Sequence, residues 1–127
     1  SRITYDADGL GTFLRGYLKG AIPFENNAKA KKKENFQNLK TQCIYKFAEK
    51  VGNDEVYFKH QSYKEEFIEE LEQIKKVDND NDSKLKVTPK SKIKELLGRS
   101  PDFSDMVIMR SIFEYKQKTG IGKSSQL

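Results

Sequence analysis

The chain has 127 residues, of which 35% are hydrophobic and 34% charged, and its formal net charge is +5. This length allows a single domain with a modest core. No apolar run approaches the roughly 20 residues of a membrane span and no signal-peptide pattern opens the chain, so we expect a soluble, intracellular protein without membrane contact. The single cysteine, Cys43, excludes an internal disulfide, and its place on an apolar helix face indicates a buried structural thiol.

The charges are distributed unevenly. Residues 1–48 carry 9 basic and 4 acidic side chains, residues 49–82 carry 5 and 11, and residues 83–127 carry 10 and 4. Basic ends around an acidic middle suit a protein that presents its ends to a polyanion such as a nucleic acid. Charge alone leaves a merely solvated surface equally open.

The chain opens with a predicted strand over 2–5 that is followed by an acidic, glycine-rich loop. Apolar residues at helical spacing then predict a helix over 10–18. The loop lacks the third small residue of a dinucleotide-binding fingerprint, because Leu14 stands there. What remains is Asp6 at the carboxyl end of a strand, where open α/β sheets place their ligands.

Further elements follow from periodicity and from turn residues. We expect strands over 21–24 and 84–88, a brief extended piece over 56–58, a turn over 78–83, and helices over 34–51, 63–77 and 91–97. The helix over 34–51 should be the longest. The glutamates of the helix over 63–77 should lie on its outer, solvated face.

The last predicted helix begins at Ser100, a good N-cap residue, with Pro101 in the first helical position. Its apolar face runs to Phe113. Asp102 and Asp105 fall in its first turn, where negative charge is favoured by the helix dipole. A second interpretation is that Asp105 binds a cation at a cleft, which requires another carboxylate from elsewhere in the chain.

The order of these pieces resembles the C-terminal nuclease domain of a tailed-phage or prophage terminase large subunit, the DNA-packaging motor protein. The specific pieces are the run Tyr5-Asp6-Ala7-Asp8-Gly9-Leu10-Gly11 and the run Gly98-Arg99-Ser100-Pro101-Asp102-Phe103-Ser104-Asp105. The resemblance implies an α/β chain with a partial ribonuclease H-like fold, a short mixed sheet and several flanking helices. Residues 1–116 would form the C-terminal part of that domain, and 117–127 a basic, disordered tail.

The resemblance also implies a metal-dependent endonuclease that hydrolyses double-stranded DNA with two Mg²⁺ or Mn²⁺ ions. Asp6 matches the second acidic ligand of the family and Asp105 the third. Asp8 is an alternative to Asp6. Asp102 is a further candidate at the metal site, where it would orient a metal-bound water or add negative charge. The family's first acidic ligand lies on a strand that precedes Ser1, so we expect the isolated chain to be an inactive fragment.

The implied partners are double-stranded DNA and other terminase or portal subunits, in the cytoplasm of a bacterial host cell. An exposed strand edge would also allow a homo-oligomer. The alternative function is a noncatalytic module that docks DNA or a protein of the packaging machine. The DNA-binding candidates are Lys29, Lys31, Lys32, Lys33, Arg99, Lys116 and Lys118.

Overall fold

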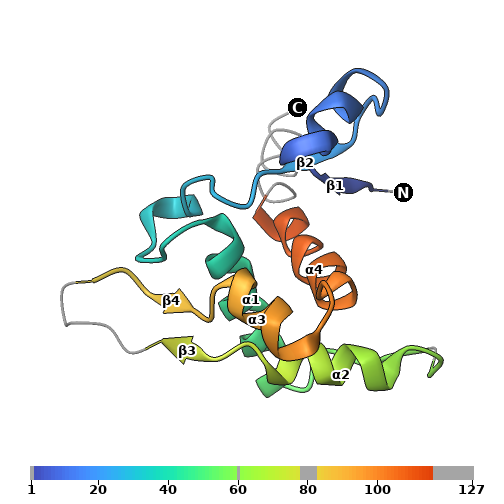
Figure 1. Cartoon of the computed structure of the whole chain (residues 1–127). Coiled ribbons are helices and arrows are strands. Elements are labelled where there is room, and N and C mark those ends of the chain that lie inside the picture. Colours follow the sequence, from blue (N-terminus) through green and yellow to red (C-terminus); the bar gives the residue numbers. More distant parts are fainter. Residues whose placement is uncertain (1, 60, 78–82, 116–127) are drawn as a thin grey trace.

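The computed structural model describes residues 2–59, 61–77 and 83–115. It shows a mixed α/β fold in which helices separate two small sheets (Figure 1). The α/β class is confirmed, although the strands form two separate pairs and not one mixed sheet. No helix among the described residues has the length and apolar character needed to cross a membrane. The predicted tail, with Lys116 and Lys118, lies outside the described residues.

The first sheet pairs β1 (Thr4–Asp6) with β2 (Ile22–Phe24) in parallel, with Asp6 opposite Phe24. A parallel pair needs a crossover connection, and the 3-10 helix η1 (Gly9–Gly16) provides it. Gly11 is required at the start of this crossover, because a Cβ atom there would overlap the backbone oxygen of Asp6.

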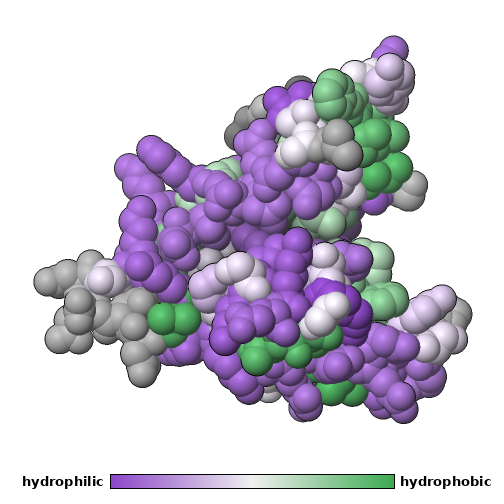
Figure 2. Space-filling view, in the orientation of Figure 1, coloured by the Kyte–Doolittle hydropathy of each residue, from purple (hydrophilic) through white to green (hydrophobic). Residues whose placement is uncertain are grey.

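The helix expected over 10–18 therefore forms, but as a 3-10 helix, and its apolar face is not buried. Phe13 is 71% exposed and Tyr17 is 83% exposed. Figure 2 shows a largely hydrophilic face with a hydrophobic patch at the end of the molecule that holds β1, β2 and η1. Within the described residues, the two short strands of this sheet offer too little surface to cover the helix.

The helix α1 (Leu39–Gly52) is the longest described helix, as expected, but it begins five residues later than the periodicity predicted. Asn38 is its N-cap, and the side-chain oxygen of Asn38 accepts a hydrogen bond from the Thr41 N–H at 2.9 Å. The residues before Asn38 take other conformations. Lys31–Lys33 form the short 3-10 helix η2, and Phe36 forms an isolated β-bridge with Leu85.

The middle of the chain differs more from the prediction. The helix α2 (Lys64–Glu72) ends before residue 77, because β3 (Lys76–Val77) pairs in antiparallel fashion with β4 (Lys86–Val87). This pairing supports the expected strand near 84–88. The extended piece over 56–58 joins no sheet among the described strands, and most of the turn predicted over 78–83 lies outside the described residues.

Two helices end the described chain. The helix α3 (Lys90–Leu97) stops at Gly98, whose φ of 72° suits a glycine cap. The helix α4 (Asp102–Met109) begins after Pro101, which takes the N-cap position in place of the expected Ser100, and a further helical turn covers 112–115. The helix α4 contacts α1, α2 and β1, so it connects the sheet that holds β1 with the helices α1 and α2.

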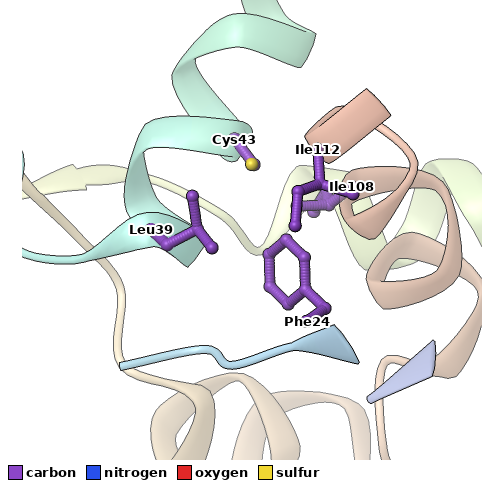
Figure 3. Packing of buried hydrophobic residues seen from close by; sticks show 5 residues of the cluster. All are labelled: Phe24, Leu39, Cys43, Ile108 and Ile112. Carbon is purple, nitrogen blue, oxygen red and sulfur yellow. The ribbon is translucent and has the colours of Figure 1, made fainter. Parts of the chain in front are cut away.

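The core lies where β2, α1 and α4 meet. Figure 3 shows the cluster of fully buried residues, Phe24, Leu39, Cys43, Ile108 and Ile112. Burial in this apolar environment raises the pKa of the Cys43 thiol to about 12. The expected structural role of this cysteine is confirmed by its complete burial.

The core position of Phe24 yields a stability prediction. Phe24→Ala should lower the free energy of unfolding by about 3–5 kcal/mol, because the ring is 0% exposed and its removal leaves a cavity. Phe13→Ala, at a ring that is 71% exposed, is the matched control and should change it by less than about 0.5 kcal/mol. Urea unfolding followed by circular dichroism measures both, and similar losses would contradict this description of the core.

Candidate functional site

The candidate site is a cleft of about 360 Å³ where six segments of the chain meet. The end of β1, the loop after β2, the N-terminal ends of α1, α3 and α4, and Ile74 after α2 all contribute lining residues. The charged side chains in this lining are Asp6, Asp8, Lys40, Lys90 and Asp105. The structure thus brings Asp6 and Asp105 to one cleft from opposite ends of the chain.

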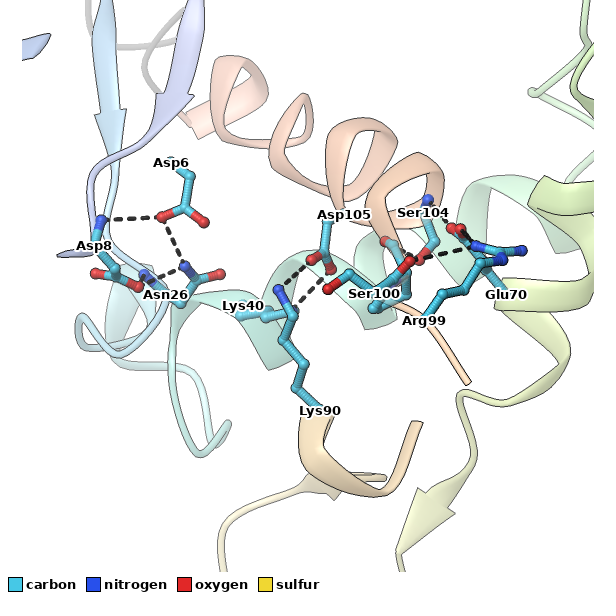
Figure 4. A network of polar contacts seen from close by, with 11 residues as sticks. Asp6, Asp8, Asn26, Lys40, Glu70, Lys90, Arg99, Ser100, Ser104 and Asp105 are labelled. Carbon is cyan, nitrogen blue, oxygen red and sulfur yellow. Dashed lines mark hydrogen bonds and ion pairs between the residues drawn. The ribbon is translucent and has the colours of Figure 1, made fainter. Parts of the chain in front are cut away.

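One side of the cleft is formed at the carboxyl ends of the parallel strands. The Asp6 carboxylate accepts hydrogen bonds from the Asp8 backbone N–H at 3.0 Å and from the Asn26 side-chain amide at 3.3 Å. The same amide donates to Asp8 at 2.6 Å, so Asn26 links the two carboxylates (Figure 4). The loop geometry makes Asp6 and Asp8 neighbours, and both remain candidates for the ligand role.

The opposite side of the cleft is Asp105, held between two lysines. Its two carboxylate oxygens accept hydrogen bonds from the ammonium groups of Lys40 at 2.9 Å and Lys90 at 2.6 Å (Figure 4). Burial lowers the pKa of Lys90, but the hydrogen bond and negative charge of Asp105, with the charges of Asp6 and Asp102, raise it above its usual value. Lys90 is therefore protonated at neutral pH.

The two first-turn aspartates of α4 differ in their surroundings. The Asp105 side chain is 18% exposed and belongs to the cleft, whereas Asp102 is exposed and does not line it. The helix dipole is a sufficient explanation for Asp102. Asp105 has, in addition, the two lysine partners.

The predicted DNA-binding residues lie elsewhere. Lys29, Lys32 and Lys33 are exposed, and Lys31 is half-buried with its backbone hydrogen-bonded to the Gln42 side chain. Arg99 is engaged by carboxylates, since its guanidinium donates to Glu70 and, at 3.2 Å, to Glu69. None of these side chains lines the cleft.

The sequence did not predict four residues of the site region, which are Asn26, Lys40, Glu70 and Lys90. Asn26 follows the end of β2, so the rule that singled out Asp6 could have found it too. Lys40 and Lys90 carry no signal, because isolated lysines at helix starts are indistinguishable from solvated ones. Glu70 was expected on the solvated face of its helix, and this is wrong: its side chain is 0% exposed.

The carboxylates of Asp6, Asp8 and Asp105 line the cleft, and carboxylate oxygens are donors that suit a hard divalent cation. Asp105 already holds two positive groups, which shows that its surroundings accept cationic charge. Within the described residues, however, no group of three or more His, Cys, Asp or Glu side chains is placed to hold a metal ion.

The fold matches solved structures of one viral protein. The nuclease domain of the large terminase subunit gp2 of bacterial virus Sf6 matches with a TM-score of 0.67 and 22% identity, over 87% of this chain and 64% of that one. A point mutant of that domain with manganese and beta-thujaplicinol matches with a TM-score of 0.66 and 20% identity over the same shares of both chains. A mutant with calcium gives 0.66 and 22%, again over 87% and 64%.

No family model matches the sequence, and no curated protein matches it either. At this level of identity the likeness shows the fold alone: the chain folds like part of the Sf6 nuclease domain. The chain spans about two thirds of the length of the solved domains, 64% in each of these three cases.

The different exposure of the two lysines yields a prediction. Lys40→Met should lower the free energy of unfolding by about 1–2 kcal/mol, because the Lys40 side chain is 20% exposed and its loss leaves Asp105 partly unpaired. Lys90→Met, at 41% exposure, should cost at most about 0.5 kcal/mol.

Urea unfolding measures both losses. Repeating each substitution in an Asp105→Asn background completes a double-mutant cycle, in which most of the Lys40 effect should vanish. A Lys40 effect that persists without Asp105 would show that the stabilisation comes from packing of the lysine stem and not from the ion pair.

Proposed function

We propose that the chain is part of the metal-dependent endonuclease domain of a phage DNA-packaging terminase, which hydrolyses phosphodiester bonds of double-stranded DNA. The observation that carries this proposal is the meeting of Asp6 and Asp105 in one cleft, on the fold of a terminase nuclease domain. Both aspartates stand at places where the family resemblance puts acidic ligands.

The chemistry of the cleft supports this proposal. Asp6 and Asp105 would hold Mg²⁺ or Mn²⁺, with Asp8 as the alternative to Asp6, and the bound ions would activate water and shield the charge of the scissile phosphate. The Asn26 amide fixes the orientation of the Asp6 carboxylate. Lys40 and Lys90 place two ammonium groups beside the carboxylates, where a phosphodiester would meet positive charge.

Metal dependence is also supported by the structural neighbours. Solved structures of the Sf6 domain contain manganese or calcium. Hard oxygen donors are the ligands that these ions share. For this chain, the described part of the site supplies Asp6 and Asp105, and a complete two-metal site would need at least one further acidic group.

The proposed partner is the backbone of double-stranded DNA, bound without sequence readout by the lysines of the segment after β2. The described candidates are Lys29, Lys31, Lys32 and Lys33, while Arg99 is now better assigned to its glutamate partners. We also propose contacts with other terminase or portal subunits. Self-association through the edge of β1 is a further proposal.

The nuclease proposal is tested by Asp105→Asn in the full-length protein, since the chain spans only part of the solved domains. Cleavage of plasmid DNA with Mn²⁺ should fall by at least about a hundredfold, because a carboxylate that would hold the metal ion is removed. Asp102→Asn, in the same helical turn but outside the cleft, is the matched control and should cleave normally. Normal cleavage by Asp105→Asn would refute the assigned role.

Metal binding has a separate test in this chain. Paramagnetic Mn²⁺ added to ¹⁵N-labelled protein should broaden the backbone amide signals around Asp6 and Asp8 at substoichiometric amounts, because the cleft carboxylates bind it first. Asp6→Asn should weaken the broadening, and Asp54→Asn, an exposed aspartate far along the chain, should not. Equal broadening in Asp6→Asn would assign the metal contact to other residues.

One observation favours the second candidate function, a noncatalytic docking module. Both oxygens of Asp105 are paired with lysines, and the described residues form no three-carboxylate group. In that case the aspartates serve the loop and the helix start, and the lysines bind DNA or a partner protein. The Asp105→Asn assay separates the two functions. The substitution should abolish cleavage if this chain is a nuclease domain and leave it unchanged if the chain is only a docking module.

A further inference from the structure

We propose that Glu70, from α2, is a positioning residue that sets the place of Asp105 in the cleft by capping the N-terminal end of α4. The inference concerns the same site as the proposed function and rests on that function only for its catalytic consequence. The positioning role itself is inferred from the contacts of Glu70, Arg99, Ser104 and Asp105.

The burial of Glu70 shows that its carboxylate has a specific partner. Its side chain is 0% exposed, and among the described buried residues it is the one with a formal charge. A buried carboxylate is costly unless charge and hydrogen bonds compensate it. Arg99 supplies the charge through Nη1, and the Ser104 backbone N–H donates to Glu70 Oε2 at 2.6 Å.

This hydrogen bond replaces the cap that α4 itself lacks. Pro101 occupies the N-cap position and makes no side-chain cap, so the first backbone N–H groups of the helix need an acceptor from elsewhere. A carboxylate is the favoured acceptor there, because the N-terminal end of a helix carries partial positive charge. Glu70 thus makes, from another helix, the contact that a capping serine or aspartate usually makes.

The capped residue is the direct neighbour of Asp105. Ser104 is buried, and the Asp105 N–H bonds to the Pro101 carbonyl at 3.0 Å in the same turn. Figure 4 shows the two sets of contacts side by side, with Lys40 and Lys90 at Asp105 on the left and Glu70 and Arg99 on the right. A shift of this turn would move the Asp105 carboxylate away from both ammonium groups.

Adjacent Glu69 offers a matched control. It also pairs with Arg99, at 3.2 Å, but its side chain is 57% exposed and it makes no contact with the start of α4 among the described residues. A residue that merely adds negative charge near Arg99 should behave like Glu69. A residue that positions Asp105 should not.

The first test observes the lysines and not catalysis. In ¹⁵N-lysine spectra at low temperature, the ammonium groups of Lys40 and Lys90 should give slowly exchanging signals, because both are hydrogen-bonded to Asp105. Glu70→Leu should abolish these signals and Glu69→Gln should leave them unchanged. Glu70→Gln keeps an acceptor oxygen for Ser104 and should restore them in part.

Amide spectra first establish which variants fold. Wild-type lysine signals in folded Glu70→Leu would overturn the proposal, because Asp105 would then keep its place without the cap. If Glu70→Leu does not fold, Glu70→Gln decides: weakened lysine signals support the proposal, and wild-type signals overturn it.

The second test measures the catalytic consequence in the full-length protein. Glu70→Gln should lower the rate of plasmid cleavage, by up to about a hundredfold for a displacement near 1 Å, while DNA affinity stays within about twofold. Glu69→Gln should cleave normally. If Asp105→Asn still cleaves DNA, the nuclease assignment is refuted. The positioning role of Glu70 is refuted separately, by wild-type lysine signals in the Glu70 variants.

Discussion

The buried carboxylate of Glu70 determines where α4 begins, and much of the structure depends on that start. A charge removed from water needs both an opposite charge and hydrogen-bond donors, and here Arg99 and the Ser104 N–H provide them. The hydrogen bond from Ser104 to Glu70 links α2 to the first turn of α4. From that point α4 extends Ile108 into the core and presents Asp105 to the cleft.

The cleft combines two environments that depend on different parts of the fold. Asp6 is presented by the carboxyl end of β1, and Gly11 allows the following loop to fold back closely over that strand end. Asp105 is presented by a helix start and is balanced by Lys40 and Lys90. One carboxylate is thus held by backbone and amide donors, and the other by ammonium charge.

The sheet that carries Asp6 is small, and its surroundings reflect this. Two strands of three residues leave exposed both Phe13, in η1, and Tyr17, which directly follows η1. The solved domains with the same fold are longer than this chain, which covers 64% of their length. The catalytic proposal therefore concerns the longer protein, to which the described residues would contribute Asp6 and Asp105.

Local patterns in the sequence determined most of the elements. Periodicity found the strand and crossover at residues 2–18, the helix that ends at Gly98, and the burial of Cys43, because each follows from side chains close together in the chain. The resemblance to terminase nuclease domains also came from the sequence, through two short runs. It singled out Asp6 and Asp105, which the fold brings to one cleft.

Only the tertiary structure decided which charges are buried and which residues meet. Glu70 lies at helical spacing from Phe67 and Ile74, but only the structure shows that its side chain is 0% exposed while that of neighbouring Glu69 is 57% exposed. Ser100 had the residue type of a cap, but the acceptor at the start of α4 comes from α2. The physical reason is that desolvation and pairing of a charge depend on distant elements packed against it, and local periodicity contains no record of them.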